Sequence, residues 1–227
     1  MKKIVEENSS TTNRNQPPQF IVVEGPIGVG KTTLAKRLAD TFRCKTLLEQ
    51  PEENPFLERF YQDQKTGALP TQLYFLFQRA QKIQEIRQGD MFQKIQVADF
   101  LMEKDQLFAQ TTLDSEELKL YQAVYKQLIL DTPKPDLVIY LQAPTDTLLN
   151  RVQRRGIKYE QSINGDYLRR LNEAYNDFFY YYDNAPLLIV NATEIDLANS
   201  EQDYQGLLDC MLNIVSGRHY YNSGASI

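Results

Sequence analysis

The sequence predicts an α/β fold built on a doubly wound parallel sheet with helices on both sides. Short runs of β-branched and apolar residues alternate with segments whose apolar residues recur at helical spacing, as expected for successive strand–helix units. The run Asp136–Leu141 is almost continuously apolar, which is typical of a strand at the centre of a parallel sheet. The first run, Phe20–Val23, leads directly into a glycine-rich turn that opens a helix.

The glycine-rich turn has the spacing G-x-x-x-x-G-K-[ST] of a phosphate-binding P-loop. Glycines let backbone N–H groups approach phosphate oxygens, and the helix N-terminus that follows favours an anion. In such a loop Lys31 reaches the β- and γ-phosphates, and the Thr32 hydroxyl ligates Mg²⁺. A turn with a chance lysine is the alternative, but the flanking strand and amphipathic helix favour nucleotide binding. We therefore expect a nucleoside triphosphate along Gly25, Pro26, Ile27, Gly28, Val29, Gly30, Lys31, Thr32 and Thr33.

The elements after the loop are predicted in chain order from period and punctuation. The first helix carries Leu34, Leu38 and Phe42 on one face. The later strands are short apolar runs bounded by turn-forming residues. We expect them at Lys45–Leu48, Gln93–Ala98, Asp136–Leu141 and Leu187–Val190.

The later helices follow from apolar residues at three- and four-residue spacing. Leu113–Leu130 opens with Asp114 and Glu117, a spacing typical of a helix N-terminus. Its apolar residues cover more than one stripe, which indicates a central helix or one that packs against another subunit. The other expected helices are Phe56–Gln62, Thr71–Arg87, Thr145–Gln153, Tyr167–Tyr182 and Tyr204–Val215.

Length and composition fit one cytoplasmic domain. We expect a single domain (19–216), because 227 residues with 42% hydrophobic content suffice for one core. The polar residues before it are expected to form a disordered N-terminal arm (1–18), and those after it a flexible tail (217–227). The balance of 30 acidic against 25 basic residues argues against nucleic-acid and membrane partners. The two distant cysteines match no metal spacing, and no signal peptide or membrane span is recognisable.

Two acids follow predicted strands and become candidates for chemistry. Glu49 ends the second strand, where a carboxylate could accept a proton from an attacking hydroxyl; the alternative is a solvated loop acid, with Glu52 and Glu53 close by. Asp99 ends the third strand, where it could partner Mg²⁺; the alternative is a helix N-cap.

Three arginines at 151, 154 and 155 form a basic cluster in a chain of net charge −5. Arg151 and Arg155 are one helical turn apart and share a face. The cluster could neutralise charge on a transferring phosphoryl group, and the alternative is a solvated helix end with favourable dipole contacts.

Together these stretches resemble the deoxynucleoside kinase family, most closely the bacterial deoxyadenosine/deoxyguanosine kinases. The resemblance rests on EGPIGVGKTTLA, LEQPEENPFLERFYQD, the Gln72–Arg79 spacing, VADFLMEKD and RVQRRG, and covers roughly residues 19–215. It implies a P-loop kinase fold with a five-stranded sheet of order 2-3-1-4-5 and an arginine-rich lid at about 151–162. It also implies ATP- and Mg²⁺-dependent phosphorylation of the 5′-hydroxyl of a deoxynucleoside, in nucleotide salvage, by a homodimer.

The resemblance implies a role for each matching residue. Glu49 matches the acid that deprotonates the 5′-hydroxyl, and Asp99 matches the strand-end acid that serves Mg²⁺ with Thr32. The implied catalytic groups are Glu49, Lys31, Arg151 and Arg155, with Arg154 on the ATP side. The implied substrate contacts are Tyr61 and Glu160 on the sugar, Gln72 on the base edge, the pair Arg79 and Asp105 beside it, and Phe75 and Phe108 as stacking or plain core residues.

One position departs from the family pattern. The family follows its strand-end acid with arginine, whereas this chain has Phe100. The sequence leaves open whether Arg79, Arg154 or a lid arginine substitutes, or whether the transfer is slower.

Two other functions fit a P-loop. A nucleoside monophosphate kinase of the thymidylate kinase type needs basic residues for the acceptor phosphate, and the stretch 49–63 is mostly acidic. A regulatory GTP switch or non-catalytic nucleotide-binding module is supported only by Phe100, and the guanine-reading Asn-Lys-x-Asp element is absent.

Overall fold

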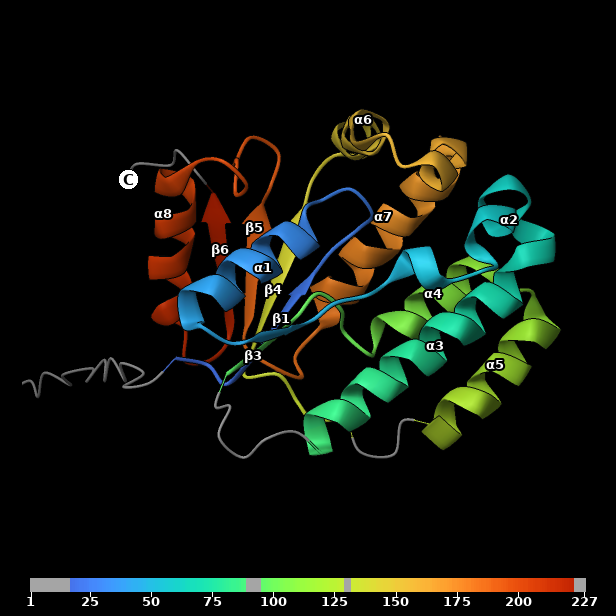
Figure 1. Ribbon diagram of the computed structural model, residues 1–227, viewed down its shortest axis with the longest axis horizontal. Helices are drawn as coiled ribbons and strands as arrows, with labels where there is room; N and C mark the ends of the chain where they lie inside the picture. The colour runs from blue at the N-terminus through green and yellow to red at the C-terminus, as the bar shows by residue number, and fades with distance from the viewer. Residues whose placement is uncertain (1–16, 89–94, 129–131, 223–227) are drawn as a thin grey trace, which may run out of the picture.

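The computed structural model describes residues 17–88, 95–128 and 132–222. Within these residues a six-stranded parallel sheet runs in the order β2-β3-β1-β4-β5-β6 (Figure 1). The first five strands stand in the expected order 2-3-1-4-5, but the expected number of strands was one too few. The strands are β1 (Phe20–Glu24), β2 (Lys45–Leu47), β3 (Gln96–Ala98), β4 (Leu137–Gln142), β5 (Leu187–Asn191) and β6 (Arg218–Asn222).

The sixth strand lies in the segment that was predicted to be a flexible tail, so that prediction is wrong for residues 218–222. Strand β6 pairs only with β5 and mixes half-buried and exposed residues, so its sequence has no apolar run to reveal it. The guanidinium of Arg218 donates hydrogen bonds to the carbonyls of Tyr180 (2.9 Å) and Tyr182 (3.1 Å). Backbone pairing and this side-chain contact therefore hold an edge strand that burial alone would not predict. Residues 1–16 of the expected arm and residues 223–227 lie outside the described part.

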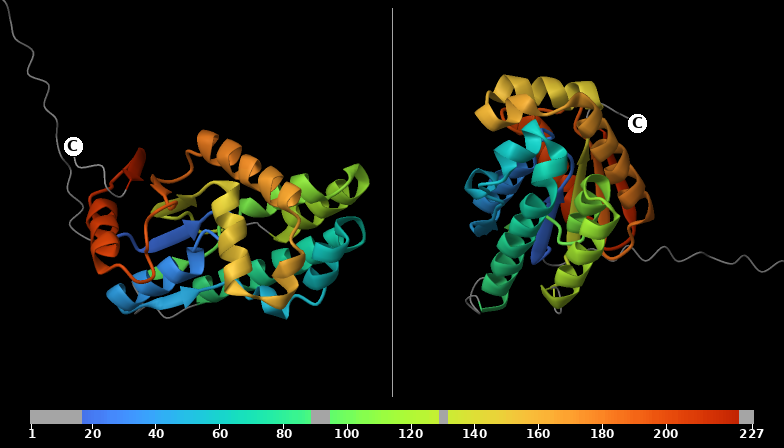
Figure 2. Two further views of the ribbon diagram at one scale, coloured as in Figure 1. Left: turned by 90° about the horizontal axis from the view of Figure 1, so that it is seen from above. Right: turned by 90° about the vertical axis from the view of Figure 1, so that its right-hand side faces the viewer.

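Helices cover both faces of the sheet, with α1 on one face and α7 on the other (Figure 2). Within the described residues, no helix is both long and apolar enough to cross a membrane. The helices are α1 (Lys31–Phe42), α2 (Leu57–Gln62), α3 (Gln64–Gln88), α4 (Lys104–Thr112), α5 (Ser115–Leu128), α6 (Thr145–Arg155), α7 (Gly165–Tyr181) and α8 (Glu201–Leu212), with the short 3₁₀ turns η1 (Pro51–Glu53) and η2 (Lys158–Ser162).

Helix α3 begins seven residues before its predicted start at Thr71, and its extra turns contain Gly67 and Pro70. Both residues are poor helix formers, which is why the helix was predicted to begin only after them. Gly67 is required by packing, because a Cβ at this position would lie 2.6 Å from the Cα of Phe60 in α2. A close approach of two helices thus overrides local propensity.

Helix α4 was not predicted at all. Its buried positions include the charged Lys104 and Asp105 beside Leu107 and Ala109, so its apolar periodicity is weak. Strand β3 is also shorter than the predicted run from Gln93, whose first two residues lie outside the described part, as do the last two residues of the helix predicted over 113–130.

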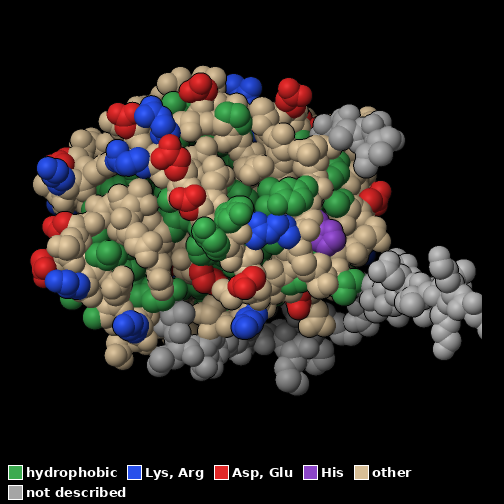
Figure 3. Space-filling model, turned by 180° about the vertical axis from the view of Figure 1, so that it is seen from behind, with side chains coloured by type: hydrophobic (Ala, Val, Ile, Leu, Met, Phe, Trp, Pro, Cys, Tyr) green, Lys and Arg blue, Asp and Glu red, His purple; other side chains and the backbone are tan. Residues whose placement is uncertain are grey.

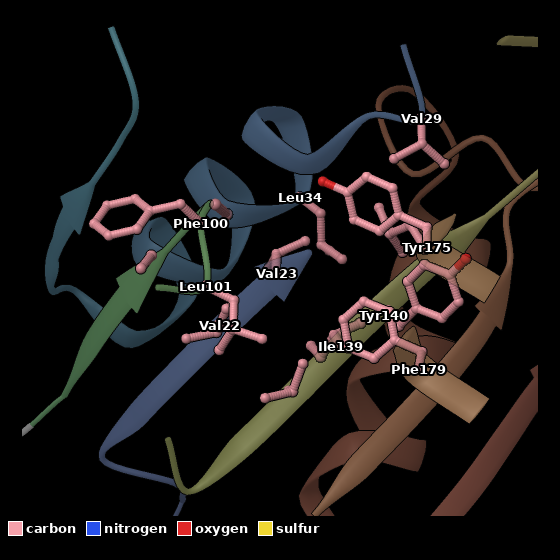
Figure 4. Close-up of a cluster of buried hydrophobic side chains, with 14 of the residues drawn as sticks. Val22, Val23, Val29, Leu34, Phe100, Leu101, Ile139, Tyr140, Tyr175 and Phe179 are labelled. Carbon is pink, nitrogen blue, oxygen red and sulfur yellow. The ribbon is translucent and has the colours of Figure 1, made fainter. Parts of the chain in front are cut away.

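An aromatic stack joins α7 to the centre of the sheet (Figure 4). Tyr140 of β4 stacks on Phe179 of α7 with ring centroids 4.1 Å apart, and its hydroxyl donates to the Asn176 side-chain oxygen at 2.8 Å. Tyr175 lies one turn before Phe179, and its ring is stacked with the rings of both Tyr140 and Phe179. Aromatic pairs of this kind contribute about 0.5–1.5 kcal/mol each beyond their area burial. The stack therefore fixes α7, and with it the Tyr175 hydroxyl, against the end of β1.

Candidate active site

The P-loop connects β1 to α1 as the sequence predicts, at the carboxyl edge of the central strand. Its first glycine, Gly25, has φ +149°, and a Cβ there would lie 2.3 Å from the Leu141 carbonyl oxygen, so only glycine fits. The Lys31 ammonium lies over its own loop and donates to the carbonyls of Gly25 (2.7 Å) and Pro26 (3.2 Å). Burial lowers the pKa of Lys31 and the charge of Lys104 lowers it further. The loop is thus a preformed anion cradle with its cation in place.

A cleft of about 740 Å³ opens beside this loop, a volume that suits a nucleotide-sized ligand. The P-loop, α6 and the segment after β5 line it, with Gly28, Gly30 and Thr33 on one side. Arg151, Arg154 and Arg155 contribute from α6. The Arg151 guanidinium also donates to the carbonyls of Ala192 (2.7 Å) and Thr193 (3.2 Å), which ties α6 to the segment after β5.

The two expected metal ligands lie together at the mouth of the loop. The Thr32 hydroxyl donates to Asp99 Oδ2 at 2.5 Å, and the Glu49 backbone N–H donates to Asp99 Oδ1 at 2.8 Å. Asp99 does not act as a helix N-cap, because the residue before α4 is Glu103. Burial, and then the charge of Glu49, raises the pKa of Asp99. These hard oxygen donors fit Mg²⁺, which needs only one or two protein ligands when phosphates supply others.

Glu49 is the acid that the structure directs into the site. Its Oε1 accepts a hydrogen bond from Arg79 Nε at 2.5 Å, and its Oε2 accepts one from Lys104 Nζ at 2.8 Å. Burial alone would raise the pKa of this carboxyl, but Arg79 and Lys104 outweigh burial and lower the pKa from 4.5 to about 2. Glu52 and Glu53 are instead exposed on η1.

Sequence reasoning missed Glu24, the last residue of β1, which is fully buried. Its Oε1 accepts the Gly25 N–H at 2.8 Å and the Tyr175 hydroxyl at 3.0 Å. Its Oε2 accepts the Leu101 N–H at 2.8 Å and lies 3.5 Å from Lys104 Nζ. An acid that closes an otherwise apolar strand is a usable signal, since a buried charge needs partners.

The wall opposite the P-loop comes from α3 and α4. Arg79 of α3 forms a buried ion pair with Asp105 of α4, and its guanidinium carbon lies 5.2 Å above the Phe75 ring. Gln72 is buried seven residues before Arg79, hence on the same face of α3. Phe108 packs edge-on against Tyr175 at 6.0 Å, and both Phe75 and Phe108 remain half-buried. The structure thus gathers these predicted base contacts on two packed helices.

Tyr61 and Glu160, the expected sugar contacts, lie on the neighbouring elements α2 and η2, which contact each other. The Tyr61 ring stacks on Tyr159 at 6.4 Å. Burial, then Tyr167 and Glu160, raises the pKa of Tyr61 well above its ordinary value, so its hydroxyl stays protonated. Glu160 accepts a hydrogen bond from Arg155 Nε at 3.0 Å.

All three lid arginines thus line the cleft beside the P-loop, but they differ in their partners. Arg151 is bonded to backbone carbonyls after β5, and Arg155 is paired with Glu160. An arginine side chain can rotate about several bonds to reach a bound phosphate. These contacts describe the position of each guanidinium before such a rotation.

Comparison with known proteins gives one consistent answer. The sequence profile of the deoxynucleoside kinase family matches residues 21–216. Deoxyguanosine kinase of Bacillus subtilis is 37% identical over 159 residues, covering 69% of this chain and 76% of the relative. Deoxyguanosine kinase of Lactobacillus acidophilus is 34% identical over 203 residues, covering 83% and 87%. Among solved structures, a deoxyadenosine kinase from M. mycoides superposes with a TM-score of 0.75 at 25% identity, covering 85% of this chain and 98% of that one.

Proposed function

Because the chain belongs to the deoxynucleoside kinase family, we propose that it transfers the γ-phosphoryl group of ATP to the 5′-hydroxyl of a purine deoxynucleoside. The observation that carries this proposal is the position of Glu49, between the P-loop and the α3–α4 wall, with a cation on each carboxylate oxygen. The names of the deoxyguanosine kinase relatives support a purine acceptor.

In the reaction Glu49 takes the 5′-hydroxyl proton while the hydroxyl oxygen bonds to the γ-phosphorus and ADP leaves. The P-loop amides and Lys31 hold the donor phosphates in line with the acceptor. Mg²⁺, for which Thr32 and Asp99 are the proposed ligands, neutralises charge on the phosphate oxygens when bound. Arg151 and Arg155 are proposed to balance the remaining charge on the transferring group, with Arg154 on the ATP side.

The acceptor side fits a neutral alcohol better than a second phosphate. Arg79 is paired with Glu49 and Asp105, and Lys104 with Glu49 and Glu24. The two cations that contact Glu49 are therefore already paired with acids. We propose that Tyr61 and Glu160 hold the sugar 3′-hydroxyl, and that Gln72 and the Arg79–Asp105 pair hold the base between Phe75 and Phe108.

We also propose a homodimer and a cytoplasmic location. Phe77 of α3 is 54% exposed and Leu120 of α5 is 53% exposed, and these two helices are neighbours (Figure 1). Apolar side chains of this size on adjacent helices support subunit contact through a helical face. On the face drawn in Figure 3, acidic and basic side chains are interspersed, so this face shows no basic patch of the kind that binds nucleic acid.

The direct experiment is a screen of the four natural deoxynucleosides and of thymidine monophosphate with Mg·ATP. We expect 5′-monophosphates of deoxyguanosine or deoxyadenosine to form fastest. Formation of a diphosphate from the monophosphate at a higher rate would support the monophosphate kinase alternative. ATP consumption without a phosphorylated acceptor would support a nucleotide-binding module.

A further inference from the structure

Two carboxylates from different strand ends meet on one buried ammonium group. Lys104 opens α4 and is only 2% exposed. Its Nζ donates to Glu49 Oε2 at 2.8 Å and lies 3.5 Å from Glu24 Oε2. A buried lysine is costly unless it is paired, so both contacts stabilise its charged form at this point.

The position directly after Asp99, where the family resemblance implies an arginine, holds an apolar side chain in this chain. Phe100 is 1% exposed and belongs to the hydrophobic core (Figure 4). Lys104, four residues later, places its positive charge on Glu49, the acid that takes the proton in the proposed reaction. Arg79 contacts the other oxygen of Glu49 and also pairs with Asp105. Arg151 and Arg155 contact the segment after β5 and Glu160.

Lys104 also connects Glu49, the proposed general base, to the P-loop. Glu24, its second partner, accepts the N–H of Gly25, the first residue of the loop. The contacts therefore form a continuous chain from the loop backbone through Glu24 and Lys104 to Glu49. Arg79 holds the other oxygen of Glu49, so the carboxylate is fixed at both ends.

We propose that Lys104 is a positioning residue for phosphoryl transfer, which holds the Glu49 carboxylate in register with the P-loop. This inference rests on the proposed function. Lys104 acts by fixing the carboxylate of Glu49, the group that takes the proton in the proposed reaction. Misplacing a reacting group by about 1 Å is enough to lower a rate about 10²-fold.

The experiment compares variants that keep or remove the charge. Lys104→Met fills a similar volume without the ammonium, and Lys104→Arg keeps a cation. The matched control is Lys82→Met, because Lys82 of α3 contacts Gln50 at 2.5 Å, beside the site but not on Glu49. Thermal unfolding verifies each fold, and Lys104→Gln replaces Lys104→Met if the latter does not fold.

We expect kcat of Lys104→Met to fall about 10²-fold while KM for ATP and deoxynucleoside changes less than about threefold. Lys104→Arg should recover at least about tenfold of that loss, and Lys82→Met should match the wild type. In a Glu49→Gln background the effect of Lys104→Met should shrink to less than about threefold, because the positioned group is gone.

A kcat of Lys104→Met within about threefold of the wild type, equal losses for Met and Arg, or multiplicative effects of Lys104→Met and Glu49→Gln would each overturn the inference. These failures are separate from failure of the proposed function, which would appear in the wild-type protein as absence of a deoxynucleotide product.

Discussion

The two sides of the site are built in different ways. The donor side consists of backbone amides, glycines and one lysine within a single strand–loop–helix segment, so its parts are adjacent in sequence. The proposed acceptor side is formed by α2, α3, α4 and η2, and buried ion pairs such as Arg79–Asp105 and Lys104–Glu49 hold it. A local motif specifies the first side, whereas only the tertiary fold can specify the second. Four changes test this contrast.

The largest effect should come from the donor side. Lys31→Met removes the only side-chain cation that the P-loop itself contributes, and kcat/KM for ATP should fall about 10³-fold. The exposed Lys36→Met on the next turn of α1 is the control and should leave kcat/KM within about twofold. Steady-state kinetics with varied ATP checks both, and a Lys31→Met loss below about tenfold would show that the loop amides suffice.

The acceptor side should make stability sensitive to acid. The pKa of Glu49 is lowered to about 2 in the folded protein, so its ion pairs stabilise the fold above pH 4.5, and this contribution is lost as the pH falls towards 2. The loss amounts to at most about 3 kcal/mol. Urea unfolding between pH 6 and pH 3 should show a shallower pH dependence for Glu49→Gln than for the wild type, with exposed Glu52→Gln as control. Equal slopes for all three proteins would contradict the lowered pKa.

The sugar contacts should produce a smaller effect. A 2′,3′-dideoxynucleoside should lose about 10- to 100-fold in kcat/KM against its deoxy counterpart, since a hydroxyl bonded to a charged group contributes about 1.5–3 kcal/mol. Glu160→Gln should reduce this difference between the two substrates, whereas the exposed Glu58→Gln on α2 should keep it. Equal discrimination by wild type and Glu160→Gln would remove Glu160 from the sugar site.

The smallest effect concerns the link between the two sides. Tyr175→Phe removes the hydroxyl that donates to Glu24 at 3.0 Å and should destabilise the protein by about 1–2 kcal/mol. The exposed Tyr181→Phe near the end of the same helix should be neutral. Thermal or urea unfolding measures both, and a neutral Tyr175→Phe would mean that Glu24 is held sufficiently by backbone N–H groups alone.

The features that could be predicted from the sequence follow the same division between local motif and tertiary fold. The order of the first five strands came from the family resemblance. Sequence reasoning itself located the P-loop and Asp99 beside Thr32, because those features depend on a local motif and on the common edge of parallel strands. It missed α4 and therefore Lys104, because a helix that buries charges has weak apolar periodicity. It missed β6 because backbone pairing, not burial, holds that strand.

Contacts in space distinguish residues that sequence spacing alone leaves equivalent. Glu49 rather than Glu52 or Glu53 enters the site, since Arg79 and Lys104 meet there in space. Arg155 lines the cleft beside the P-loop and is also paired with Glu160, so its contact with the phosphates stays a prediction.

The central claim is that one carboxylate, Glu49, stands between donor and acceptor and takes the hydroxyl proton. Single-turnover phosphoryl transfer by Glu49→Gln, with Mg·ATP affinity measured in parallel, tests it most directly. We predict a rate about 10²- to 10⁴-fold below the wild type with ATP affinity changed less than about threefold. A transfer rate within about threefold of the wild type would contradict the account.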